Sequence, residues 1–115
     1  MADFPRVFKV RQHFQVVECE DVAAAVEAQL SGLNLSEKIK PGETVAISAG
    51  SRGIANIHTA IRAIVQHIQG LGGEPFVVPA MGSHGGGTAE GQRAIVEGYG
   101  MTEEFLGCPI KATME

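Results

Sequence analysis

Residues 44–79 alternate apolar runs with a helical pattern, and this alternation limits the folds open to the chain. Thr44–Ser48 and Glu74–Pro79 are apolar runs of strand length. The segment between them carries apolar residues at helical spacing: Ile57, Ala60, Ile61, Ile64, Val65 and Ile68. A strand, a helix and a second strand with short connections predict a right-handed crossover and a parallel sheet. We therefore expect an α/β fold with a Rossmann-like parallel, or mostly parallel, sheet and flanking helices.

Weaker patterns predict the elements on either side of this unit. Val7–Arg11 and Gln15–Cys19 are β-type runs that could form a hairpin or an edge pair. A short helix over residues 22–30 follows acidic residues and ends at Ser31-Gly32. Further expectations are a helical turn within Leu33–Lys40, a turn at Lys40–Glu43, a helix cap at Asn56, a helix over Ala89–Tyr99, a helical turn at Thr102–Glu104 and a strand start at Cys108–Lys111.

The composition is that of one globular domain and argues against several partners. The chain has 115 residues, of which 44% are hydrophobic, and a formal net charge of −4. This charge and the few aromatic residues give no reason to expect nucleic acid as a partner. No apolar run approaches the roughly 20 residues of a membrane span, and no signal peptide is evident, so we expect a cytoplasmic protein. Cys19 and Cys108 are far apart, without metal-type spacing, and are expected to be reduced thiols.

The second strand leads into the most distinctive stretch of the sequence, Pro79–Gly91. His84 is its titratable side chain, and Thr88 suits the N-cap of the next helix, where free N–H groups favour an anion. Four glycines here permit a positive φ and a close approach to a ligand: Gly82, Gly85, Gly86 and Gly87. The stretch matches neither G-x-x-x-x-G-K-S/T nor G-x-G-x-x-G. A plain flexible turn with an exposed histidine is the alternative.

A second loop of small residues, Ala49–Gly53, follows the first strand and contains Arg52. Loops at the carboxyl ends of neighbouring parallel strands, about 5 Å apart, share one edge of the sheet. Arg52 and His84 could therefore reach one ligand. Arginine grips carboxylate or phosphate, and histidine can exchange a proton near neutral pH, which indicates a small anionic substrate or a nucleotide phosphate. Ser51 and Ser83 lack a G-x-S-x-G context and a base placed by spacing, so hydrolase chemistry is disfavoured.

The two loops also resemble a known family. S-A-G-S-R-G-I-A-N-I, followed by G-G-E-P-F-V-V-P-A-M-G-S-H-G-G-G-T-A-E-G-Q, is similar to the N-terminal domain of the nickel-dependent lactate racemases, and more closely to their lactate-racemase-domain branch. The resemblance covers about Lys40–Glu115. It implies an isomerase of 2-hydroxy acids, in which a nickel pincer nucleotide accepts hydride while histidines move the hydroxyl proton.

The resemblance implies roles for individual residues. The A-x-G-x-H motif of the family falls on Ala80, Gly82 and His84, which makes His84 the candidate acid/base. The D-x-T-R loop falls on residues 49–52, so Arg52 matches its arginine, and the absence of the aspartate and the threonine leaves the hydroxy acid open. The residues implied at the cofactor edge are Gly82, Ser83, Gly85, Gly86, Gly87 and Thr88.

The lysine and the nickel-binding histidine of the family lie beyond these 115 residues, so we expect the N-terminal part of a longer two-domain enzyme, without metal or activity by itself. Two alternatives stay open. One is a non-catalytic anion- or nucleotide-binding module that uses the same loops, and the other is a structural assembly domain. The sequence also leaves open whether the protein forms a homo-oligomer.

Overall fold

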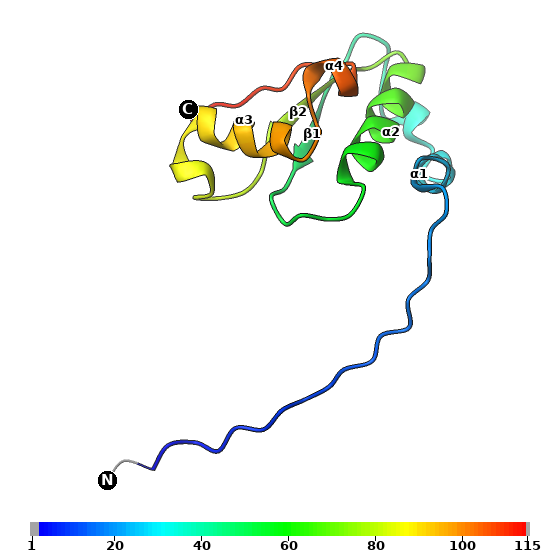
Figure 1. Ribbon diagram of the computed structural model, residues 1–115. Helices are drawn as coiled ribbons and strands as arrows, with labels where there is room; N and C mark the ends of the chain where they lie inside the picture. Colours follow the sequence, from blue (N-terminus) through cyan, green and yellow to red (C-terminus); the bar gives the residue numbers. More distant parts are fainter. Residues whose placement is uncertain (1–2, 115) are drawn as a thin grey trace.

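The computed structural model describes residues 3–114 and divides them into an extended N-terminal arm and a folded body (Figure 1). Residues 3–20 contain no helix or strand, and every one of them is exposed. The hairpin predicted for Val7–Arg11 and Gln15–Cys19 is therefore wrong. A two-stranded hairpin buries too little surface to be stable alone, and no part of the body covers these residues.

The body is built on a parallel pair of strands joined by a crossover helix. Strand β1 (Thr44–Ala49) and strand β2 (Glu74–Pro79) are hydrogen-bonded in a register that pairs Thr44 with Glu74 and Ala49 with Pro79. Helix α2 (Ile57–Gly70) connects them, which confirms the predicted parallel arrangement. The strand expected at residues 108–111 is reduced to one parallel bridge between Ile110 and Val77. The protein is thus α/β, and since two paired strands occur in many α/β architectures, a Rossmann-like sheet stays a prediction.

One side of the sheet forms the core, and the other is open. Ile47 and Val77 are paired and buried, and they pack in one cluster with Ile61 and Val65 of α2. The alternate residues of β1, at positions 44, 46 and 48, are exposed. Only the odd-numbered side of the apolar run in β1 is covered, because the helices supply apolar residues to that side.

Five further helical segments of the described chain surround this unit. They are α1 (Val22–Ser31), the 3-10 turns η1 (Leu35–Glu37) and η2 (Gly85–Gly87), α3 (Ala89–Gly98) and α4 (Glu103–Leu106). The Asp21, Thr88 and Thr102 side chains cap their helices by accepting a backbone N–H. Asn56 occupies the predicted cap position of α2 with φ of 58°, but its side chain makes no capping hydrogen bond. Among residues 3–114, no helix is both long and apolar enough to cross a bilayer.

Candidate functional site

The two predicted loops leave the same edge of the sheet, next to each other. Ala49 and Pro79 are the last pair of the β1–β2 register, and the N–H of Ala80 donates to the carbonyl of Ala49 at 2.8 Å. Residues 50–56 then lead to α2, and residues 80–88 lead to α3 (Figure 1). The strand register therefore determines that side chains of these loops can meet.

Ser51 and His84 make the contact between the loops. The Ser51 hydroxyl lies 2.5 Å from Nδ1 of the His84 ring. Because Nδ1 is engaged, Nε2 is the ring nitrogen left for a ligand. Sequence spacing suggested no base for Ser51, but the fold brings this imidazole to it across 33 positions of the chain. Among the described residues no carboxylate is hydrogen-bonded to His84, so the pair lacks the acidic third member of a hydrolase triad.

Helix α3 holds both loops from one side. The hydroxyl of Tyr99, at the C-terminal end of α3, donates to the backbone carbonyl of Ser51 at 3.1 Å. The side-chain amide of Gln92, which is buried, donates to the carbonyl of Gly82 at 2.6 Å. Neither contact could be predicted from the sequence, because each joins residues outside one another's local pattern, 48 and 10 positions apart. They fix the backbone on each side of the Ser51–His84 pair.

The glycines of the second loop serve two different purposes. Gly82, Gly85, Gly86 and Gly87 all have φ between 61° and 68°, which confirms the positive φ expected of them. Gly85 is pressed against α3, since a Cβ there would lie 2.4 Å from the carbonyl carbon of Gly91. At Gly82, Gly86 and Gly87 a Cβ would meet nothing within 4 Å, so the backbone is open to solvent there. The short turn η2 (Gly85–Gly87) thus packs on one side and is accessible on the other.

The remaining predicted site residues lie on the same edge but do not all contact one another. Thr88 is used locally: its hydroxyl accepts from the N–H of Gly91 at 3.1 Å and lies 3.2 Å from the carbonyl of Gly85. Ser83 and Arg52 are exposed. Ser51, and not Arg52, is the residue of the first loop that meets His84. A ligand shared by Arg52 and His84 stays a prediction.

The residues of this edge fit an anionic group. Open glycine backbone and an exposed serine can face a phosphate or a carboxylate, and α3 begins directly after them. Glu90 in the first turn of α3 adds a negative charge that weakens this attraction. Within residues 3–114 no group of three or more His, Cys, Asp or Glu side chains is arranged to hold a metal ion. The described chain therefore offers a backbone cradle and an imidazole, and no nickel ligand set.

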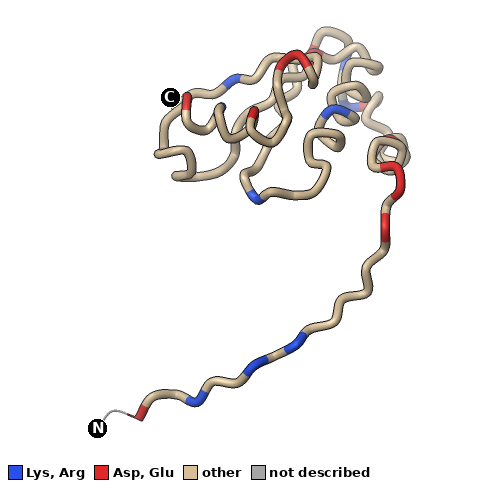
Figure 2. The backbone as a smooth tube through the Cα atoms, in the orientation of Figure 1, with Lys and Arg blue, Asp and Glu red and all other residues tan. Residues whose placement is uncertain are grey.

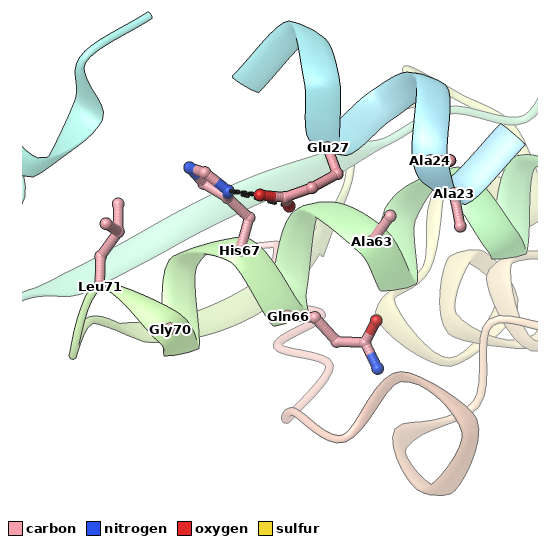
Figure 3. Close-up of a pocket in the computed structure, with 8 residues that line it drawn as sticks. All are labelled: Ala23, Ala24, Glu27, Ala63, Gln66, His67, Gly70 and Leu71. Carbon is pink, nitrogen blue, oxygen red and sulfur yellow. Dashed lines mark hydrogen bonds and ion pairs between the residues drawn. The ribbon is translucent and has the colours of Figure 1, made fainter. Parts of the chain in front are cut away.

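A hollow lined by a titratable pair lies elsewhere, between α1 and α2 (Figure 3). It has a volume of about 530 Å³, and Nδ1 of His67 and a carboxylate oxygen of Glu27 are 2.9 Å apart within it. The hydrogen bond from His67 holds the pKa of Glu27 below its ordinary value. The Ser31 hydroxyl of α1 donates to the same oxygen of Glu27 at 3.1 Å, so this carboxylate is held from both helices. We interpret it as a tie between the two helices.

Comparisons of the chain with protein-family models, with curated proteins and with solved structures found no match. The functional interpretation therefore depends on the loop motifs and on the geometry of the Ser51–His84 pair.

Proposed function

We propose that this chain is the N-terminal, Rossmann-like domain of an isomerase related to the lactate racemases, acting on a 2-hydroxy acid. The observation that carries the proposal is the Ser51–His84 hydrogen bond, which joins the two crossover loops at the glycine-lined edge of the sheet. These are the loops whose residues resemble the motifs of that family. The position of the pair suits proton transfer to a ligand at this edge.

In the proposed reaction, His84 takes the proton of the substrate hydroxyl at Nε2 and returns it later. When Nδ1 carries a proton, it donates to the Ser51 oxygen, and Nε2 has a lone pair free for the substrate. The same hydrogen bond persists when the ring is doubly protonated. Ser51 can therefore keep the ring in one orientation through the whole proton cycle.

The other residues of the edge bind and orient. Arg52 is exposed on the loop that carries Ser51, and its guanidinium suits the carboxylate of a hydroxy acid. The open backbone at Gly82, Gly86 and Gly87, with Ser83 beside it, would hold the edge of the nickel pincer nucleotide. When bound, that group supplies the acceptor for the hydride from the carbon that carries the hydroxyl.

Two measurements test the proposal. In the full-length enzyme loaded with pincer nucleotide, chiral chromatography measures the interconversion of the enantiomers of lactate or a related hydroxy acid. His84→Ala should lower turnover about 10²–10⁴-fold, the range for loss of an acid/base. His13→Ala is the matched control, because His13 lies exposed in the N-terminal arm. Unchanged turnover in His84→Ala would remove His84 from the mechanism.

Imidazole ¹⁵N NMR provides a test independent of turnover. Titration with lactate should shift the Nε2 signal of His84 more than the Nδ1 signal, since Nδ1 already has a partner. Arg52→Ala should weaken this titration, and Arg6→Ala in the arm should not. Nucleotide binding at this edge without any interconversion would instead favour the non-catalytic anion-binding module, for which the open glycine backbone is the supporting observation.

A further inference from the structure

The N-terminal arm, residues 3–17, exposes far more apolar surface than a stable monomer usually leaves in one place. Its phenylalanines Phe4, Phe8 and Phe14 are 87%, 86% and 73% exposed. In Figure 1 the arm runs away from the body, starting where α1 begins. The radius of gyration is 18.5 Å, against about 13 Å for a compact chain of this length. Contiguous apolar surface of this kind marks an interaction site.

The arm has the residue pattern of a strand with one covered face. In an extended chain, alternate side chains point to opposite faces. The even-numbered positions carry most of the large apolar residues: Phe4, Phe8, Val10, Phe14 and Val16. The odd-numbered positions from 9 to 15 carry polar residues: Lys9, Arg11, His13 and Gln15. The alternation has exceptions, since Val7 and Val17 are apolar on the odd face and Arg6 and Gln12 are polar on the even face. This alternation predicts a strand whose even face is buried against a partner.

The body has a sheet edge that could receive such a strand. Within residues 3–114, β1 has β2 on one side and no strand on the other. The carbonyls of Glu43 and Ala49 accept hydrogen bonds from the β2 side, so the odd-numbered residues face β2. The alternate residues Thr44, Ala46 and Ser48 turn their backbone groups to the open side, and all three are exposed. An edge of this kind is a template for strand addition.

Charge also favours contact between the arm and the body. Residues 3–17, the outer part of the exposed segment 3–20, contain three basic residues and one acidic residue, and Glu18 and Glu20 follow at its root. The rest of the chain contains six basic and twelve acidic residues. Figure 2 shows the basic residues spaced along the arm, with acidic residues at its root and over the helices. The basic arm of one copy is therefore attracted to the acidic body of a second copy.

We propose that the arm of one copy adds as a strand to the open edge of β1 in a second copy, and that the exchange is reciprocal. Each aromatic side chain buries about 150–250 Å². Three phenylalanines on each of two arms would bury roughly 900–1,500 Å² before any backbone is counted, which brings the contact into the range of stable protein interfaces. A symmetric exchange of this kind closes as a dimer.

The oligomeric state of the full chain tests this proposal. Light scattering and sedimentation should give a dimer whose mass falls on dilution. The double substitution Phe8→Ser with Phe14→Ser should weaken the dimer at least about 100-fold, as expected for two buried aromatic anchors. The matched control, His13→Ser with Gln15→Ser, changes the polar face of the same segment and should leave the dimer intact. The helical signal in circular dichroism should be unchanged in both, because all four side chains are exposed and lie outside the helices of the body.

A second variant tests the receiving edge. Ala46→Pro removes an N–H that faces away from β2, a position where edge strands tolerate proline. Alone, this variant should be monomeric and folded. Mixed with the Phe8→Ser, Phe14→Ser variant, it should form a heterodimer, since one chain supplies an arm and the other supplies an edge.

Three results would overturn the proposal. A wild-type chain that is monomeric at every concentration would mean that the arm folds back or serves another partner. A dimer that persists in the phenylalanine variant would remove the arm from the interface. A mixture that gives no heterodimer would exclude the β1 edge as the receiving surface.

Discussion

Gly91 is the position where an added methyl group should destabilise the candidate site most. A Cβ at Gly91 would lie 1.9 Å from the carbonyl oxygen of Gly85 and 2.9 Å from the Thr88 hydroxyl. The nearest atom is backbone, so the turn η2 must move to make room. Overpacking of this kind lowers the free energy of unfolding by about 1–3 kcal/mol, whereas replacing glycine by alanine within a helix raises it by about 0.5–1 kcal/mol. Because the overlap is large, we expect Gly91→Ala to lower the free energy of unfolding by about 1–2 kcal/mol.

Urea denaturation followed by circular dichroism measures this change, and the midpoint of thermal unfolding should fall by about 5–15 °C. Gly98→Ala is the matched control on the same helix, since a Cβ there would meet nothing within 4 Å and the residue has helical φ. It should be neutral or stabilising by up to about 1 kcal/mol. A Gly91→Ala protein as stable as the wild type would refute the close packing of α3 against η2.

Three further predictions concern other parts of the body. Thr88→Ala removes the N-cap of α3 and should cost about 0.5–2 kcal/mol in urea denaturation, whereas an unchanged midpoint would argue against the cap. The hydrogen bond with His67 lowers the pKa of Glu27 in the folded protein. The ionised Glu27 therefore stabilises the fold at pH values above its ordinary pKa of 4.5, and this stabilisation is lost as the pH falls through the lowered pKa of the folded state. In Glu27→Gln the midpoint of thermal unfolding should therefore fall less steeply as the solution is acidified. The same pH dependence as in the wild type would contradict a stabilising Glu27–His67 hydrogen bond. Cys19 is exposed, while burial of Cys108 raises the pKa of its thiol, so a thiol reagent should react quickly with Cys19 alone until the protein is unfolded.

The sequence was most informative where local pattern and long-range packing agreed. The bounds of β2 follow from its apolar run between glycines and the Pro79 loop, and α2 follows from its stripe of isoleucines. The arm shows the limit of that reasoning. Its β-type pattern is present in the sequence, but a strand needs a neighbour, and in the described residues the arm is paired with no strand.

The candidate site could be predicted in outline but not in its contacts. Parallel neighbouring strands were enough to place the two loops on one edge, and glycine content was enough to predict a positive φ in the second. The partner of His84 could not be predicted, because Ser51 and Arg52 are adjacent and spacing does not say which one turns toward the imidazole. The same holds for Gln92, whose burial against Gly82 depends on how α3 returns over the loop.

Helix α3 is the element on which the geometry of the site depends. Tyr99 holds the loop that carries Ser51, Gln92 holds the loop that carries His84, and Gly91 sets how close η2 can approach. A ligand that displaced either loop would have to break a hydrogen bond to this one helix. The His84 imidazole is therefore held in position before a ligand binds, although the backbone of its loop is open to solvent. Such preorganisation lowers the entropic cost of binding and is the physical reason to look for chemistry at this edge.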